Sequence, residues 1–382
     1  MAFEITCKDG PSAARCGVLS TPHGPVRTPA FMPVGTQGSV KAMHPRDLEE
    51  LGADIVLGNT YHLSLRPGAE LIRSLGGLHS FIGWQRAILT DSGGFQIYSM
   101  QGRHRVLEEG VRFNSHLDGS EHLMTPESCV RNQLSFGSDI IMVLDHCLPY
   151  PAPTPVVREA TELTCRWAAR SLAEYRRVPG PAGGALFGIQ QGGFDPRQRR
   201  ACAERLAELD FAGHAVGGLS VGEPKKLLLE TAALCAPMLP DDRPRYLMGV
   251  GPPDDLLTMI GLGYDLFDCV LPTRNARTGT LFTSRGRLSI KHAHYRNDPS
   301  PIDPECGCSV CSRFSRAYLR HLFVSGEILA SMLNTHHNLH FFLTLMARAR
   351  EAIAAGRFTR FRDDFIDGFR QRSSLDVEKK ST

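Results

Sequence analysis

Residues 139–145 read Asp-Ile-Ile-Met-Val-Leu-Asp, a short apolar run that ends in a polar residue. A stretch with helical spacing, 155–177, follows it. Seven more runs of the same kind occur along the chain, at 30–35, 54–59, 87–90, 185–191, 214–218, 246–251 and 266–272. Further helical stretches lie between them at 196–209, 223–238 and 253–262. Eight strands that alternate with helices predict an α/β fold, a (β/α)8 TIM barrel.

An open, doubly wound sheet is the alternative fold. It leaves sheet edges and usually carries a glycine-rich nucleotide fingerprint, which the sequence lacks. Within a single catalytic domain over 1–382, we expect a strand cap at 2–28 and a hairpin in 102–125, where Asp118-Gly119 is a turn signal. The stretch 276–335 after the eighth strand is too long for a plain connection and predicts an insertion.

Bulk composition fits an ordinary globular protein: 382 residues, 42% apolar and 22% charged. No apolar run is long enough for a bilayer, and the N-terminus lacks the pattern of a secretion signal, so we expect a cytoplasmic protein without membrane contact. Eleven cysteines in such a chain indicate thiols or metal ligands. Between Arg274 and Arg320, nine Lys/Arg face three Asp/Glu. This basic window could hold phosphates or could simply be a solvated surface.

Polar groups follow the strand runs at their carboxyl ends, where barrel enzymes place their chemistry. These groups are Asp91, Asp145, Gln191, Gly217-Gly218, Met248-Gly249 and Asp268. A single carboxylate there could be a helix cap, but caps alone do not explain three on separate strands. We therefore expect the three carboxylates to meet in one site.

Cys306, Cys308 and Cys311 form a Cys-x-Cys-x-x-Cys run, and a histidine-rich segment follows. Three thiolates and one imidazole make a closed tetrahedral set that suits a structural zinc ion. Spacing alone leaves the fourth ligand open among His336, His337, His340 and His321. We expect one zinc ion per chain, which holds the insertion together.

Several blocks resemble the tRNA-guanine transglycosylase (queuine tRNA-ribosyltransferase) family in its bacterial form. They are 89–96 (LTDSGGFQ), 187–192 (FGIQQG), 215–219 (AVGGL), 246–251 (YLMGVG), 267–277 (FDCVLPTRNAR) and the cysteine run followed by His337-Asn338. The resemblance is nearly full length. It implies exchange of the guanine at the anticodon wobble position of the tRNAs for aspartate, asparagine, histidine and tyrosine against 7-aminomethyl-7-deazaguanine, in queuosine biosynthesis.

The resemblance also implies roles for single residues. Asp268 would be the nucleophile of a covalent aspartyl-ribosyl intermediate, and Asp91 the general acid/base. The implied base pocket comprises Asp91, Ser92, Gly93, Gly94, Phe95, Asp145, Gln191, Gly218, Leu219 and Met248, and the implied zinc set is Cys306, Cys308, Cys311 and His337. Glu223 would brace the Leu219 peptide, whose carbonyl would accept the exocyclic amine.

The resemblance places the tRNA contacts on Gly249, Val250, Gly251, Pro252, Pro253, Asp254, Asp255, Thr273, Arg274, Asn275, Ala276 and Arg277. It also implies a homodimer that forms through the zinc region, with Phe314, Tyr318 and His321 as an aromatic patch, although buried core is an equal interpretation of these residues. Cys147 and Val221 favour the aminomethyl base over queuine. His146 stands where bacterial members usually carry glutamate, which affects the choice of base.

Two other functions stay open on the residues alone. A retaining glycoside hydrolase could use Asp91 and Asp268 as its carboxylate pair. It would not need the basic, zinc-clamped insertion. A catalytically inactive partner subunit that only binds tRNA is the second alternative, but such a subunit should lack the nucleophile, and Asp268 is present.

Overall fold

The computed structural model describes residues 1–99, 104–178 and 184–378. Its centre is a parallel sheet in the order β4-β15-β14-β13-β12-β11-β7-β6-β5. The bounds are β4 Ala30–Met32, β5 Val34–Gly35, β6 Ile55–Asn59, β7 Ala87–Asp91, β11 Ile140–Met142, β12 Ala185–Gln190, β13 Gly213–Val216, β14 Arg245–Leu247 and β15 Leu266–Asp268. Strands consecutive in the chain are neighbours in the sheet, as in a barrel.

Proline at position 33 explains why nine strands stand where eight are expected. β4 pairs with β15, and β5 pairs with β6, so the two short strands are halves of one predicted run. Proline has no N–H to donate to a ladder, and Pro33 interrupts the strand, although its carbonyl still accepts from the Leu57 N–H at 3.0 Å. The sheet thus closes on itself. The predicted (β/α)8 barrel is confirmed, and the open-sheet alternative is wrong.

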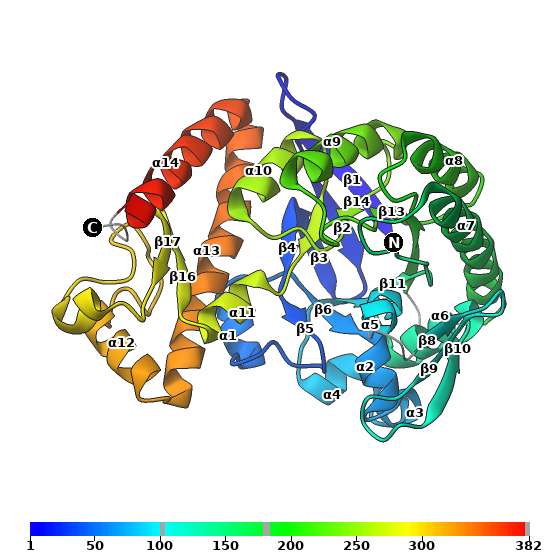
Figure 1. The fold of residues 1–382 in the computed structure, drawn as a ribbon, viewed down its shortest axis with the longest axis horizontal. Coiled ribbons are helices and arrows are strands. Elements are labelled where there is room, and N and C mark those ends of the chain that lie inside the picture. The colour runs from blue at the N-terminus through cyan, green and yellow to red at the C-terminus, as the bar shows by residue number, and fades with distance from the viewer. Residues whose placement is uncertain (100–103, 179–183, 379–382) are drawn as a thin grey trace.

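Helices surround the barrel (Figure 1). After β11 to β14 come α7 Thr154–Arg177, α8 Pro196–Ala207, α9 Lys225–Cys235 with the 3₁₀ turn η1 Ala236–Met238, and α10 Pro253–Gly261. The earlier connections hold α1 Pro45–Glu50, α2 Thr60–Leu65, α3 Ala69–Ser74, α4 Gly77–Ile82, α5 Gly94–Ser99 and α6 Pro126–Phe136. Asp195 caps α8 by accepting from Arg197 N, and Pro196 occupies the first turn of the helix.

The main apolar core fills the barrel and the space under its helices. It includes Leu57, Leu89, Met142, Phe187 and Leu266, each almost fully buried. Because this interior is packed with side chains, the polar groups at the strand ends are held on a rigid base.

Antiparallel strands form two small sheets in the regions of the expected strand cap and hairpin, of which residues 102–103 lie outside the described structure. The first contains β1 Ala2–Lys8, β2 Arg15–Thr21 and β3 Gly24–Thr28, and the second β8 His104–Val106, β9 Val111–Asn114 and β10 Glu121–Met124. In the second sheet, Ser120 N donates to Asp118 Oδ1 at 3.2 Å, and Gly119 has φ +77°. The Asp118-Gly119 turn therefore lies where the sequence predicts it.

The chain leaves the barrel after β15 through α11 Leu271–Arg277. It then forms β16 Thr280–Thr283, β17 Gly286–Ser289, the 3₁₀ turn η2 Ala293–Asn297 and α12 Arg316–Val324. Helices α13 Ile328–Ala354 and α14 Phe358–Glu378 follow. Figure 1 shows β16, β17 and α12 to one side of the barrel, with α13 between them and the strands. Within the described part of the chain, no helix has both the length and the apolar character that a bilayer crossing needs.

Candidate active site and metal centre

A cavity of about 370 Å³ lies at the carboxyl ends of the barrel strands. Asp91 and Asp268 are the last residues of β7 and β15, and Asp145 follows β11. All three carboxylates line the cavity, together with Gln191, Gly218, Leu219 and Met248. The structure thus brings together the strand-end residues that the sequence singles out.

Asp91 accepts hydrogen bonds from one side chain and from two backbone N–H groups. Asn59 is its partner in the β6–β7 ladder, and the Asn59 amide donates to Asp91 Oδ2 at 2.7 Å. The backbone N–H groups of Thr60 and Gly93 each donate to Oδ1 at 3.1 Å. Burial raises the pKa of the Asp91 carboxyl to about 7, the charge of Asp268 adds to this, and the hydrogen bonds oppose it. A carboxyl with that pKa can give and take a proton near neutral pH.

Glycine at position 93 is required by this geometry. Its φ is +77°, and a Cβ there would lie 2.7 Å from Tyr61 N. A larger residue would displace the turn that presents its N–H to Asp91.

Asp268 receives two hydrogen bonds on one oxygen. The Tyr246 hydroxyl donates to Oδ1 at 2.6 Å, and the Gly249 N–H donates to the same atom at 2.9 Å. Burial raises the pKa of Asp268, and these two donors counter that rise. Oδ2 has no hydrogen bond to any residue that the structure describes.

Asp145 and Gln191 line the cavity next to each other. Asp145 accepts from Gln191 Nε2 at 2.6 Å and from the Ser92 hydroxyl at 3.1 Å. Burial raises the pKa of Asp145, and these donors act against it. A carboxylate beside a carboxamide can bind a ligand edge that carries both N–H donors and a carbonyl.

A tight turn after β13 forms the adjacent wall. Gly218 has φ +70° and Ser220 has φ +60°. Glu223 accepts from Ser220 N at 2.6 Å and from Val221 N at 2.8 Å. Because the N–H of the Leu219–Ser220 peptide is bound to Glu223, its carbonyl faces away from Glu223. The predicted bracing contact of Glu223 is therefore present in the structure.

Phe95 and Met248 both line the cavity, as do Cys147 and Val221. Phe95 is 51% exposed, so its ring is free to cover a flat ligand. Gly94 does not line the cavity; a Cβ there would meet the Asp145 carbonyl at 3.0 Å. His146 is also outside the lining set, and burial lowers its pKa to about 4. His146 is therefore neutral at physiological pH.

The residues implied in tRNA contact differ in accessibility. Arg274 is exposed on α11 and lines the cavity together with Gly249, while Pro252 is exposed, and Asn275 and Arg277 are partly so. Val250, Gly251, Pro253, Asp254, Asp255, Thr273 and Ala276 are buried. Lys225 Nζ lies 2.6 Å from carboxylate oxygens of both Asp254 and Asp255. Of the residues implied in tRNA contact, only the exposed and partly exposed ones can therefore present their side chains to a ligand.

Cys306, Cys308, Cys311 and His337 form a second functional cluster, whose ligand atoms all lie within 4.8 Å of one another. His337 Nδ1 is 3.8, 3.6 and 3.4 Å from the three sulfurs in that order. Its Nε2 donates to the Phe282 carbonyl at 2.7 Å, which leaves Nδ1 free as a ligand. These four residues could hold a metal ion.

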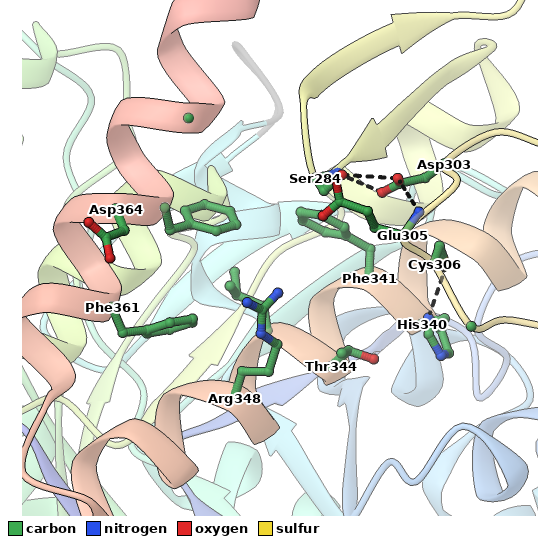
Figure 2. A pocket seen from close by; sticks show the side chains of 14 residues that line it. Ser284, Asp303, Glu305, Cys306, His340, Phe341, Thr344, Arg348, Phe361 and Asp364 are labelled. Carbon is green, nitrogen blue, oxygen red and sulfur yellow. Dashed lines mark hydrogen bonds between the residues drawn. The ribbon is translucent and has the colours of Figure 1, made fainter.

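Two other candidate histidines also lie near this cluster. His340 Nδ1 is 3.5 Å from Cys306 and lines a separate cavity of about 360 Å³ between α13 and α14 (Figure 2). His336 Nε2 faces the Ser309 hydroxyl at 3.5 Å. Of the candidates left open by spacing, only His337 contacts all three sulfurs in the described structure.

Sequence reasoning missed three residues that support the site. Asn59 and Tyr246 donate to the two central aspartates. Arg199, fully buried on α8, donates to the carbonyls of Gly193, Gln190 and Gly217 and so joins the two glycine turns at the cavity. Asn59 ends a predicted strand run, which is a signal that could have found it; the other two roles depend on tertiary contacts.

Comparison with known proteins gives one family. The family model for queuine tRNA-ribosyltransferase matches residues 9–371. A queuine tRNA-ribosyltransferase of Nitratidesulfovibrio vulgaris is 56% identical over 363 residues, which is 95% of this chain and 96% of the relative. One from Caldanaerobacter subterraneus subsp. tengcongensis is 54% identical over 364 residues, 95% and 96% of the two chains.

Proposed function

Because the chain belongs to the queuine tRNA-ribosyltransferase family of pentosyltransferases, we propose that it exchanges the wobble guanine of the tRNAs for aspartate, asparagine, histidine and tyrosine for 7-aminomethyl-7-deazaguanine. The single observation that carries this proposal is the meeting of Asp268, Asp91 and Asp145 at one cavity at the strand ends. A nucleophile, an acid/base and a guanine-binding carboxylate are the groups that base exchange needs.

Asp268 attacks the ribose. Its Oδ2 bonds to C1′ as the bond from C1′ to guanine N9 breaks, and the released electron pair stays on the guanine. The donors Tyr246 and Gly249 hold Oδ1 in place during this step. In the second step the incoming base attacks C1′, and the ester bond to Asp268 breaks. Two displacements at C1′ preserve its configuration, as in retaining glycoside cleavage.

Asp91 moves the proton in both steps. It protonates the leaving guanine, and as a carboxylate it then takes the N9 proton of the incoming base. The pKa of about 7 supports both duties, since each protonation state is well populated near neutral pH. The two steps leave the enzyme unchanged.

The base is recognised by the wall of the cavity that contains Asp145 and Gln191. Asp145 accepts from N1–H and the 2-amino group, and Gln191 donates to the purine carbonyl beside the Gly218 N–H. Phe95 and Met248 enclose the ring. The Leu219 carbonyl accepts from the aminomethyl group, and neutral His146 adds no charge there. Cys147 and Val221 on the cavity wall favour the compact aminomethyl base over queuine.

The RNA surface lies around the cavity mouth. Exposed Arg274, with Arg277 beside it, binds phosphates, and the target nucleotide is flipped toward Asp268. The basic insertion 276–335 extends this surface.

Zinc is the metal that the thiolate cluster fits. Bonds of about 2.3 Å to sulfur and 2.0–2.1 Å to nitrogen, at a tetrahedral angle, separate S and N by about 3.6 Å. The distances of 3.4–3.8 Å from His337 to the sulfurs bracket this value. The ion would join the loop of Cys306–Cys311 to α13, with no position left for substrate.

A homodimer is supported by apolar groups on the insertion side. Val324 and Ile328, on and after α12, are 61% and 79% exposed, and Tyr318 is 39% exposed. The rings of Phe314 and Tyr318 stack at 5.4 Å. Such a group of exposed apolar side chains is typical of a subunit interface.

Incorporation of radiolabelled guanine into unmodified tRNA of the four types tests the proposal. The wild-type enzyme, Asp268→Ala, Asp268→Asn and the surface control Asp242→Asn are compared. We expect the control to label at the wild-type rate and both Asp268 variants to lose labelling by at least a thousandfold. Normal labelling by both would contradict the assignment. The aminomethyl base and queuine, added as competitors, distinguish the two incoming bases.

A further inference from the structure

Asp139 lies at the opposite rim of the barrel from the cavity. It directly precedes β11, whose other end leads to Asp145. Its N–H donates to the Ile88 carbonyl at 2.9 Å, and its carbonyl accepts from Ala185 N at 2.8 Å. Asp139 therefore joins the starts of β7, β11 and β12, where the proposed exchange reaction uses no residue.

Two histidines converge on its side chain. His23 Nδ1 lies 2.8 Å from Oδ1, and His79 Nε2 lies 3.1 Å from Oδ2. Their rings are stacked, with centroids 3.5 Å apart and planes 16° apart. His23 comes from the turn between β2 and β3, and His79 from α4. Three segments far apart in the sequence thus present two imidazoles and one carboxylate to a common point.

The donor set has the chemistry of a transition-metal site. One ligand atom from each residue can be chosen so that all lie within 4.8 Å of one another. Imidazole with a carboxylate suits zinc and its neighbours, whereas magnesium and calcium prefer oxygen alone. Burial raises the pKa of Asp139, but the hydrogen bonds from His79, His23 and Ile88 outweigh burial and hold it below its usual value, so the carboxylate is anionic.

A buried anion needs a cation close by. The Asp139 side chain is fully buried and that of His79 is 9% exposed, while that of His23 is 36% exposed. Without metal, protons on the ring nitrogens make the contacts to Asp139. A divalent ion can replace these protons, releasing them to solvent, and water can reach a fourth position past His23.

We propose that His23, His79 and Asp139 form a second metal site, which takes Zn²⁺ or Co²⁺ and joins the β2–β3 turn to the base of the barrel. The role is structural. It is independent of the thiolate centre, and the exchange reaction does not require it.

Cobalt titration of the metal-free full-length chain tests the site. Thiolate-bound Co²⁺ gives an intense near-ultraviolet charge-transfer band, whereas a site with only N and O ligands gives weak visible bands. Wild-type protein should bind two equivalents, only one with the charge-transfer band. His23→Gln should bind only the thiolate-linked equivalent, while the exposed control His122→Gln should bind both. Cys306→Ser should lose the intense band and keep the weak one.

Zn²⁺ should also raise the unfolding temperature of wild-type protein by several degrees more than that of His23→Gln, with equal guanine exchange by both. A wild-type chain that binds one equivalent, all of it with the charge-transfer band, overturns the proposal without any variant. Binding of two equivalents of cobalt by both the wild-type protein and His23→Gln would also overturn the proposal. A wild-type chain that shows the weak visible bands but no charge-transfer band would contradict the thiolate centre and would still support the site at Asp139.

Discussion

The Tyr246 hydroxyl donates a hydrogen bond to Asp268 Oδ1 at 2.6 Å, from one barrel strand to the next. In the β14–β15 ladder Tyr246 pairs with Leu266, two residues before Asp268. Tyr246 is 1% exposed, and burial raises its pKa far above the ordinary value, so the hydroxyl keeps its proton. This fixed donor orients the carboxylate of Asp268, which lines the cavity.

Tyr246→Phe removes that donor without changing the shape of the core. We expect kcat for guanine exchange to fall by roughly 10- to 100-fold, because a hydrogen bond to a charged group contributes about 1.5–3 kcal/mol. The KM for tRNA should change little, since the Tyr246 side chain is only 1% exposed. An unchanged kcat in steady-state assays would mean that Gly249 alone positions the nucleophile.

The pKa of about 7 for Asp91 predicts opposite pH dependence for the two half-reactions. Release of guanine needs the protonated acid and should slow as pH rises above about 7. Attack by the incoming base needs the carboxylate and should slow as pH falls below it. Single-turnover rates from pH 5.5 to 8.5 measure the two limbs separately. Limbs that fall in the same direction would rule out Asp91 as the shared group.

Asn59→Ser should move both limbs to higher pH. The Asn59 amide donates to Asp91, which stabilises its charged form, and removal of the donor therefore raises the pKa further. Serine keeps an oxygen to cap α2, where Asn59 now accepts from His62 N. A profile identical to wild type would show that this hydrogen bond does not tune Asp91.

His337→Ala should abolish metal binding at the thiolate cluster. His337 is fully buried and contacts all three sulfurs. We expect the zinc content of the chain to fall by one ion and the KM for tRNA to rise at least tenfold as the insertion loosens. His336→Ala is the matched control, since His336 faces Ser309. Equal zinc content in both variants, by elemental analysis, would contradict the ligand set.

Glu223→Ala should separate the two bases. Its carboxylate fixes the Leu219–Ser220 peptide through Ser220 N and Val221 N. Without it, the Leu219 carbonyl is no longer held toward the aminomethyl group. We expect the KM for 7-aminomethyl-7-deazaguanine to rise about tenfold or more, while guanine exchange stays within about threefold. Glu230→Ala, at an exposed position of α9, should change neither value. Equal losses for both bases would indicate a general disturbance of the cavity.

Ile328→Glu should convert a dimer to monomers in sedimentation velocity. Ile328 is 79% exposed, so a charge there costs the folded monomer little but disfavours burial in an interface. Val156→Glu on α7, where the side chain is 41% exposed, is the control. Dimers that persist in Ile328→Glu would place the interface elsewhere.

The barrel could be predicted because its strand runs are short, apolar and regularly followed by helical patterns. The break at Pro33 was not predicted, although proline in a central strand was a visible signal. The strand-end aspartates could also be located, since the carboxyl ends of parallel strands meet at one rim. Their donors could not, because the reach of Tyr246 to Asp268 depends on the register of two strands.

The candidate metal centre could also be predicted only in part. The cysteine spacing identifies the thiolates, but the choice among four histidines depends on how α13 is turned and on the position of the Phe282 carbonyl. Fewer residues can contact tRNA than the resemblance implies, because Val250, Asp254 and Asp255 are buried. The burial of Asp254 and Asp255 could not be predicted, because it depends on their ion pairs with Lys225. Lys225 lies about thirty residues earlier in the chain, and its Nζ is 2.6 Å from both carboxylates.

The most direct measurement is mass spectrometry of enzyme quenched in denaturant with unmodified tRNA and then digested with protease and nuclease. The account predicts a ribonucleotide linked through C1′ to the peptide that contains Asp268, lost in Asp268→Asn and on addition of excess 7-aminomethyl-7-deazaguanine. A wild-type enzyme that exchanges guanine at full rate while carrying its RNA adduct on another residue, such as Asp91, would contradict it.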